Sequence, residues 1–376
     1  MIFTNSVKYK QIKHLVPTEY QKPLFVNLEQ AGDKRAGELI DAILNAPEEQ
    51  REAVIFLISY MPRVDLVKVS KEFLLENVRL AYLTKEKFPW GESISKEEFF
   101  HYVLPYRIAQ EPLENWRTYL LNEMMPDLDT VTTATQAAII ANKCCGERVK
   151  FKQTQREDQG VLQTIRSGNG RCEEMMIVYV ATLRAIGIPA RQAWTPYWAT
   201  GDNNHAWTEV WADGSWHYTG SCEPRPSLND AWFNKSVKRA AVVLSTTYGK
   251  MEDSDEIVYK SFDRFTITNS TPNYTDPYEL DILVNIDTFP AESIGVYISV
   301  FNWGALRSIL GKQTDEEGKV KFYLNEGTYF LSAGNKYLKS FEIIELKSDT
   351  TFTLDLKERD IPDRYFWMRY KSLEEL

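Results

Sequence analysis

Apolar residues in the first part of the chain recur at steps of three and four, which is the spacing of one face of a helix. The clearest examples are Leu39, Ile40, Ile43 and Leu44, followed by Val54, Ile55, Leu57 and Ile58. Ser95 and Glu98 have the spacing of a capping box, in which two side chains cap the start of a helix. These patterns predict a helical N-terminal region over residues 1–148.

The pattern changes over residues 149–248, where one helix is followed by short strand-like runs. The helix is predicted from Cys172 to Ile186, because Gly187 and Pro189 are typical of a helix end. Four strands are predicted in the runs "ARQAWTPYW", "HAWTEVWA", "SWHYTG" and "AAVVLSTT". A helix followed by antiparallel strands indicates an α+β core.

The last part of the chain alternates apolar and polar residues with a period of two. Residues 249–275 are rich in turn residues and are predicted to be a connector with one strand at 256–261. Residues 276–376 predict five to seven short strands in a small β-sandwich, of an immunoglobulin-like or carboxypeptidase-regulatory-like type. This segment contains neither His nor Cys, so we expect no catalytic set within it.

Composition excludes several classes of partner. The 53 acidic residues outnumber the 44 basic ones, and the net charge of -9 argues against a nucleic-acid partner. The apolar runs are shorter than the roughly 20 residues of a membrane span. The first residues lack the apolar segment of a signal peptide, so the protein is secreted or periplasmic only if a leader was removed. Location and oligomeric state are left open.

The four cysteines are too few for a disulfide framework in a chain of 376 residues. Cys144 and Cys145 end an apolar helical run and are interpreted as packing residues. No Cys or His cluster has the spacing of metal ligands, so we expect neither a metal nor another cofactor. Any reaction at a thiol therefore depends on the other two cysteines, Cys172 and Cys222.

Cys172 follows the turn Gly168-Asn169-Gly170 and begins the predicted helix. The start of a helix carries partial positive charge, which favours a thiolate, and its N–H groups can face an oxyanion. The glycines leave room for a substrate to approach the sulfur. The alternative is an inert, buried thiol.

A thiolate needs a base, and the chain has four histidines. Asp213-Gly214 predicts a two-residue hairpin turn, which places Trp211 opposite Trp216 and His205 opposite Cys222. His217 then falls on the opposite face of the hairpin from His205. We therefore expect His205 to be the partner of a catalytic cysteine.

These segments resemble the core of the transglutaminase-like superfamily. The matching residues lie between about 160 and 224 and are "GRC" at 170–172, "LRA" at 183–185, "GIPAR" at 187–191, "HAWTEV" at 205–210, Gly214 and Trp216. The resemblance implies a papain-like fold, Cys172 as nucleophile and His205 as base. The helical region and the sandwich resemble parts of multidomain bacterial members.

The third catalytic member departs from the family pattern. The family carries Asp four residues after the hairpin tryptophan, and this chain has Gly220 there. The next acid is Glu223, which a bend before Pro224 would return toward His205. We predict that Glu223 orients His205; a solvated acid at a strand end is the alternative.

Other groups complete the predicted site. The Cys172 N–H and the side-chain amides of Gln159 and Gln163 are candidate oxyanion donors. Three tryptophans are candidates for a substrate groove: Trp194, Trp198 and Trp207. Ordinary polar surface and hydrophobic packing are the respective alternatives.

The sequence thus predicts an enzyme that cleaves or transfers an amide through a Cys172 thioester, with a peptide or protein as substrate. Water as acceptor gives a peptidase or amidase, and an amine gives acyl transfer. The alternative is an inactive transglutaminase-like module that binds a protein or peptide, which the glycine at position 220 favours.

Overall fold

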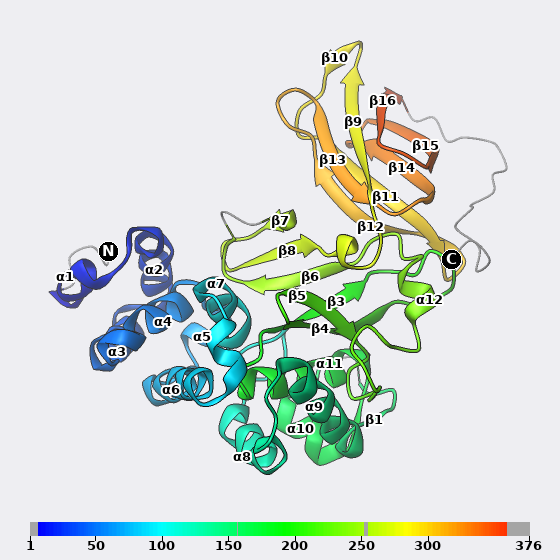
Figure 1. Ribbon diagram of the computed structural model, residues 1–376. Coiled ribbons are helices and arrows are strands. Elements are labelled where there is room, and N and C mark those ends of the chain that lie inside the picture. The colour runs from blue at the N-terminus through cyan, green and yellow to red at the C-terminus, as the bar shows by residue number, and fades with distance from the viewer. Residues whose placement is uncertain (1–6, 156, 252–254, 359–376) are drawn as a thin grey trace. The chain divides into compact units, whose positions relative to one another are not determined.

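The computed structural model describes residues 7–155, 157–251 and 255–358 (Figure 1). The chain divides into two compact units, each made of segments that are separated in the sequence. The first unit comprises Met1–Gln192, Trp207–Ala231 and Thr246–Thr268. The second comprises Ala193–Ala206, Trp232–Ser245 and Asn269–Leu376. The chain therefore passes between the units several times, and the boundaries expected at 148, 248 and 275 stay predictions.

The N-terminal region is helical, as predicted. Its helices are α1 (Val7–Ile12), α2 (Thr18–Ala31), α3 (Asp33–Asn45), α4 (Glu48–Ser59), α5 (Arg63–Leu66), α6 (Lys71–Lys87), α7 (Lys96–Glu98), α8 (Trp116–Leu128) and α9 (Ala134–Arg148). The capping box is present, since Glu98 N donates to Ser95 Oγ at 3.1 Å and Ser95 N to Glu98 Oε2 at 2.7 Å. Among the described residues, none of the helices has the length and apolar character to cross a membrane.

Helix α11 (Cys172–Ala185) lies in the middle of the apolar core of the first unit. Its residues from Glu174 to Ala185 are buried. The shorter helix α10 (Val161–Ser167) precedes it, and the two-residue strands β1 (Lys150–Phe151) and β2 (Asn169–Gly170) pair in parallel beside its start. Because α11 is buried along its length, its first residue is held by a rigid element.

A six-stranded sheet follows, in the order β5-β4-β3-β6-β8-β7. Its strands are β3 (Ala190–Thr195), β4 (His205–Ala212), β5 (Ser215–Thr219), β6 (Leu244–Tyr248), β7 (Ile257–Ser261) and β8 (Phe265–Asn269). The first four strands and β7 were predicted. Strand β8 was not, because turn-rich sequence surrounds it.

The hairpin of β4 and β5 has the predicted register near its turn, with Trp211 opposite Trp216. Asp213 and Gly214 both have positive φ, at 53° and 80°, as a two-residue turn requires. The pairing ends at Thr208 opposite Thr219, so the predicted pairing of His205 with Cys222 is wrong. The chain leaves the sheet after Thr219 and turns at Cys222, whose φ is 57°.

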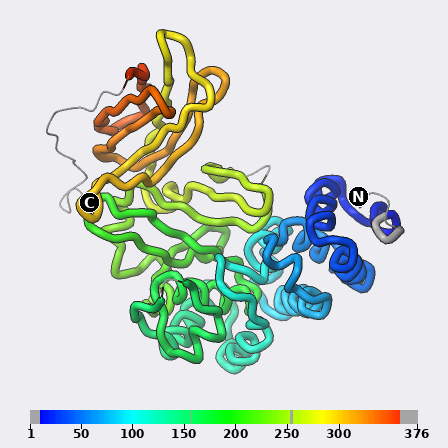
Figure 2. Tube along the Cα trace, turned by 180° about the vertical axis from the view of Figure 1, so that it is seen from behind, coloured from blue at the N-terminus to red at the C-terminus, as the bar shows by residue number. Residues whose placement is uncertain are grey.

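The second unit contains the predicted sandwich of two sheets, shown from two sides in Figures 1 and 2. One sheet has the order β10-β9-β13 with β16 beside β9, and the other the order β12-β11-β14-β15-β17. The strands are β9 (Tyr278–Ile286), β10 (Phe289–Pro290), β11 (Gly295–Asn302), β12 (Ala305–Gln313), β13 (Lys319–Leu324), β14 (Gly327–Gly334), β15 (Leu338–Leu346), β16 (Thr350–Asp355) and β17 (Lys357–Glu358). Alternate residues of β9 and β11 are buried, which accounts for the period-two pattern.

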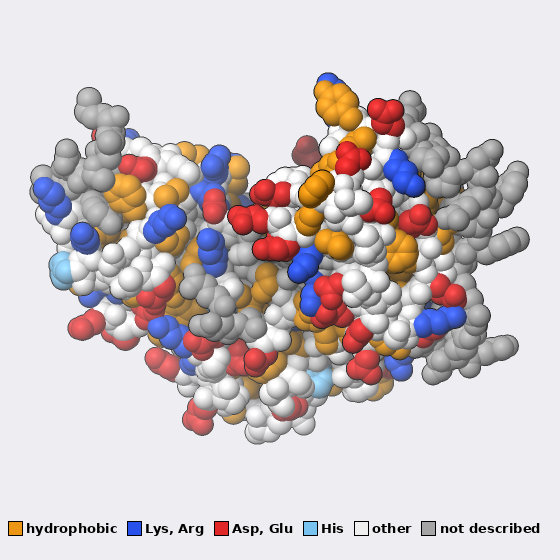
Figure 3. All heavy atoms as spheres, turned by 90° about the horizontal axis from the view of Figure 1, so that it is seen from above, with side chains coloured by type: hydrophobic (Ala, Val, Ile, Leu, Met, Phe, Trp, Pro, Cys, Tyr) orange, Lys and Arg blue, Asp and Glu red, His pale blue; other side chains and the backbone are white. Residues whose placement is uncertain are grey.

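Acidic side chains are spread over the face seen in Figure 3, in keeping with the net charge of -9. The fold is thus α+β, with a helical N-terminal region, a core of helices and a six-stranded sheet, and a C-terminal pair of sheets.

Candidate active site

Cys172 is the first residue of α11, and the turn before it has the predicted form. Gly168 ends α10 with a left-handed φ of 69°. A Cβ at Gly170 would lie 3.1 Å from Glu174 Cβ and 3.2 Å from Thr164 Cγ2, so packing favours glycine there. The glycines therefore bring the chain tightly into the helix that begins at the candidate nucleophile.

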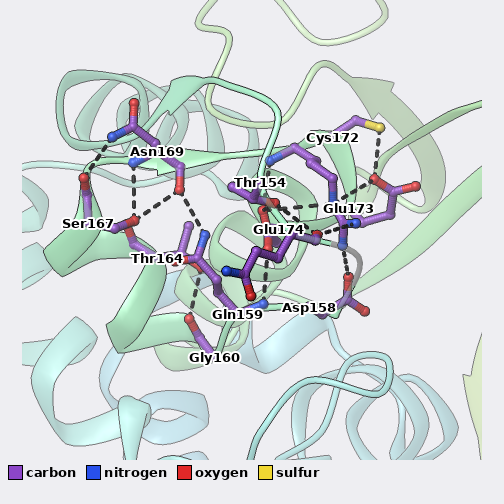
Figure 4. Close-up of polar contacts among 12 residues, drawn as sticks. Thr154, Asp158, Gln159, Gly160, Thr164, Ser167, Asn169, Cys172, Glu173 and Glu174 are labelled. Atoms are coloured by element: carbon purple, nitrogen blue, oxygen red, sulfur yellow. Dashed lines mark hydrogen bonds and ion pairs between the residues drawn. The ribbon is translucent and has the colours of Figure 1, made fainter.

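Glu174 fixes the segment in front of this helix start (Figure 4). Its fully buried carboxylate accepts hydrogen bonds from Arg171 N at 2.8 Å, Gln159 N at 3.0 Å and Thr154 Oγ1 at 2.7 Å. A carboxylate in the first turn also suits the partial positive charge of the helix start. The sequence analysis missed Glu174, although its position three residues after Arg171 is typical of a capping glutamate.

The sulfur of Cys172 is partly exposed and donates a hydrogen bond to Glu173 Oε2 at 3.1 Å (Figure 4). Two effects therefore oppose one another at this thiol. The helix start favours the thiolate, whereas the neighbouring carboxylate favours the protonated sulfur. Burial raises the pKa of the second partly exposed thiol, Cys144, to about 11, with help from Asp127.

The two predicted oxyanion side chains have other contacts. Gln159 Nε2 donates to Asn169 O at 3.1 Å. Gln163 is exposed, and its Oε1 accepts from Gly160 N at 3.4 Å. Both contacts fit the structural alternative, and the backbone N–H of Cys172 is the remaining candidate donor.

His205 is the first residue of β4 and lies among aromatic rings of the second unit. Its ring centroid is 6.3 Å from that of Trp198, 5.0 Å from Trp232 and 4.9 Å from Phe233. Trp232 is 57% exposed, so it offers an open indole face beside the imidazole. Trp232 and Phe233 were not predicted, because they lie in an irregular segment well beyond the hairpin.

The three predicted groove tryptophans differ in exposure. Trp194 is half-buried in β3, opposite Leu244 of β6. Trp198 is largely buried and stacks on His205. Trp207 is fully buried, which favours the packing role for this residue.

The structure brings Glu223 and Gly220 together. A Cβ built on Gly220 would overlap Glu223 Oε2 and would lie 3.1 Å from Glu223 Cβ. The glutamate side chain therefore folds back over the α-carbon of Gly220. The bend needed for this return occurs at Cys222, in the left-handed conformation, rather than at the residue before Pro224. A carboxylate thus lies where a side chain at position 220 would begin.

Helix α9 holds this bend from the other side. Asn142 is buried, and its Nδ2 donates to Gly220 O at 2.8 Å and to Thr219 Oγ1 at 3.1 Å. A Cβ on Gly146 would lie 2.8 Å from both Cys222 O and Pro224 Cδ, so only glycine fits without displacement. Sequence reasoning missed both residues, because nothing local links them to a bend so far along the chain.

A buried ionic cluster joins β3 to β4. Arg191 Nε donates to Glu209 Oε2 at 2.6 Å, and Arg191 Nη1 donates to Glu256 Oε2 at 2.7 Å. The guanidinium also lies 3.9 Å from the centroid of the Trp216 ring. Burial opposes the charge of Arg191, but Glu209 and Glu256 outweigh it and raise the pKa of the guanidinium. The cluster fixes the strand that begins at His205.

Among the described residues, no group of three or more His, Cys, Asp or Glu side chains is arranged to hold a metal ion. The model of the transglutaminase-like superfamily matches residues 121–219. Residues 121–219 are therefore similar to the core of this superfamily. The matched stretch runs from α8 through Cys172 and the β4–β5 hairpin, and it ends one residue before Gly220.

Twelve chains of solved structure match this protein. One is a candidate cysteine protease from Cytophaga hutchinsonii, with 12% sequence identity and a TM-score of 0.30. The alignment covers 71% of this chain and 63% of that chain, so the protein spans less than two thirds of its length. Among curated proteins, none matches this sequence.

Proposed function

We propose that this protein is a cysteine enzyme that acts on amide bonds, with Cys172 as nucleophile and His205 as general base. The observation that carries the proposal is the position of Cys172, partly exposed at the first turn of a buried helix within a transglutaminase-like core. The chain also keeps a histidine at the first residue of β4, where the family resemblance puts the base.

In the proposed reaction, His205 takes the thiol proton and the sulfur attacks the carbonyl carbon of the amide. The tetrahedral intermediate collapses, His205 protonates the departing amine, and a thioester on Cys172 remains. Water then releases a carboxylic acid, or a second amine takes the acyl group. We propose hydrolysis of a peptide or protein amide as the primary activity and acyl transfer as the alternative.

We propose that Glu223 orients the imidazole of His205. The overlap between its carboxylate and the space at Gly220 supports this role, because related sequences carry their acid at that position. The exposed indole of Trp232 beside His205 is proposed to contact the substrate, together with Trp194 and Trp198. Trp207 is omitted from this set because its side chain is fully buried.

One observation favours the second candidate, an inactive module that binds a protein or peptide. The Cys172 thiol donates to Glu173, and this contact stabilises the unreactive protonated sulfur. Reactivity of the thiol therefore separates the two candidates.

The test is alkylation of the intact protein by iodoacetamide across pH, with each thiol followed by peptide mass spectrometry. We expect Cys172 to react at least about tenfold faster than Cys144 near pH 7, because a thiolate is the reacting form. His205→Ala is expected to remove this advantage. His217→Ala is the matched control, because His217 contacts Ser215 and Ala212 at the hairpin turn.

Turnover is tested on libraries of peptides and glycopeptides, with and without an amine acceptor. Cys172→Ala is expected to abolish all product formation. Slow alkylation of Cys172 and Cys144 at similar rates, unaffected by His205→Ala, would contradict the enzyme and favour the binding module.

A further inference from the structure

The last residue of β11, Asn302, is fully buried and binds the loop between β3 and β4. Its Nδ2 donates to three backbone carbonyl oxygens, those of Trp198 at 3.0 Å, Gly201 at 2.8 Å and Asn203 at 3.2 Å. Its Oδ1 accepts from Asn203 N at 3.2 Å. One side chain of the sandwich therefore forms hydrogen bonds with four backbone groups of the loop over residues 196–204.

Two further contacts join the same loop to the hairpin of β11 and β12. Trp303 N donates to Asp202 Oδ1 at 2.5 Å. The Arg307 guanidinium lies 5.9 Å from the ring centroid of Tyr197. Trp303 and Gly304 both have positive φ, so the hairpin ends in a tight two-residue turn. The contacts thus come from a compact, well-defined turn.

The loop has little structure of its own. It lacks helix and strand, and Asn203 has a φ of 109°, which a residue with a side chain rarely adopts. A strained conformation persists only when its surroundings determine it, and here Asn302 bonds to both the N–H and the carbonyl of Asn203. The loop leads directly into His205, the first residue of β4.

We propose that Asn302 is a positioning residue for His205, so that the β-sandwich is part of the reaction machinery. The inference rests on the proposed function. Asn302 fixes Asn203, two residues before the imidazole, and Trp198 is bound by Asn302 at its carbonyl and stacks on the imidazole with its ring. The side chain thereby sets both the backbone before His205 and one aromatic neighbour of its ring.

The test uses the full chain labelled with ¹³C at its histidines. The sequence has four histidines, so the ring signals that disappear in His205→Ala are those of His205. We expect Asn302→Ala to shift these signals and their pH midpoint while leaving those of His101 and His217 in place. Alkylation of Cys172 is expected to slow by about ten- to a hundredfold, since small misplacements of a catalytic group cost that much.

Asn269→Ala is the matched control. Asn269 is also buried, and its Nδ2 donates to Tyr323 O of the sandwich at 2.8 Å. This control is expected to leave the His205 signals unchanged and the alkylation rate within about twofold. If Asn302→Ala folds and behaves like Asn269→Ala in both measurements, the inference is overturned.

A milder variant decides if Asn302→Ala does not fold. Asn302→Ser keeps a small polar side chain in the buried site but cannot form all four bonds, so a smaller shift of the His205 signals is expected. Unchanged signals in Asn302→Ser would then overturn the inference. Failure of the proposed function can be distinguished from failure of this inference. If the protein lacks the proposed chemistry, His205→Ala leaves the alkylation rate of Cys172 unchanged, but Asn302→Ala still shifts the His205 signals.

Discussion

The carboxylate of Glu223 lies over the α-carbon of Gly220, in the space that a side chain at position 220 would fill. Three features make this arrangement possible. Position 220 has no side chain, and Cys222 turns the chain back with a φ of 57°. Gly146 of α9 has no Cβ, which leaves room for Pro224 to pack against the helix. We propose that Glu223 thereby replaces the acid that the family pattern places at position 220.

Exchange of the two positions tests this replacement. Glu223→Ala is expected to lower turnover by about 10²- to 10⁴-fold, as loss of an orienting carboxylate does in comparable triads. Adding Gly220→Asp to Glu223→Ala is expected to restore much of that activity, because the acid then starts from the position used in the family. The measurement is kcat and KM on a substrate found in the library screen.

Gly220→Ala alone is the complementary variant, and it is expected to lower kcat because its methyl group displaces the Glu223 carboxylate. Full activity of Glu223→Ala would show that this acid has no part in catalysis.

Asn142 is expected to stabilise the bend that carries Glu223. Asn142→Ala removes two hydrogen bonds and leaves Gly220 O buried, so the free energy of unfolding should fall by about 1–3 kcal/mol. Urea denaturation measures this loss. Asn45→Ala is the control, because Asn45 is exposed and its Nδ2 donates to Asp41 O within the same helix. Equal stability of the two variants would contradict the prediction.

Glu173 is expected to restrain the nucleophile. Glu173→Gln removes the negative charge beside the sulfur, so the thiolate becomes easier to form and alkylation of Cys172 should speed up about three- to tenfold near pH 6.5. Glu157→Gln, which removes an exposed charge next in sequence to Asp158, the partner of Arg171, should have little effect. Slower alkylation in Glu173→Gln would indicate instead that Glu173 assists deprotonation.

His101 is expected to destabilise the fold in acid. Burial lowers the pKa of His101 below its usual 6.5, against the opposing effects of its bond to Tyr248 O and of Glu97. Below about pH 6.5 the unfolded chain therefore binds the proton more readily, and stability is lost as pH falls, by about 1.4 kcal/mol for each unit of pKa difference.

Urea denaturation between pH 5 and 8 measures this slope. His101→Asn keeps a donor for Tyr248 O and loses the titrating ring, so its stability should decline less toward acid. His14→Asn, at an exposed position, should keep the slope of the parent protein. An unchanged slope in His101→Asn would rule out this source of acid sensitivity.

Local patterns predicted the parts of the site that local chemistry determines. Asp213-Gly214 set the hairpin register near its turn, and Gly187, with a φ of 77°, ends the helix that begins at Cys172. Strict alternation failed beyond Thr219, because the conformation of Cys222 depends on contacts with α9 rather than on its neighbours in sequence. Asn142 lies 78 residues from its partner Gly220, a distance over which periodicity carries no information.

The roles of Trp232 and Asn302 were out of reach for the same reason. Each contacts His205 or its loop from tens of residues away in the sequence, and neither belongs to a recognisable motif, so the proposed roles have no local signal. The position of Cys172 was predictable because a glycine turn and a helix start are both local features.

The interleaving of the two compact units has a practical consequence for anyone shortening this protein. A chain that ends at Thr268 would lack Asn302. It would keep residues 193–206 and 232–245 but lose the remainder of the unit to which they belong. Such a truncation is expected to disrupt the second unit, so a loss of any activity would not show that the missing strands contact a substrate. Single substitutions at Asn302 therefore test its role without removing the rest of the unit.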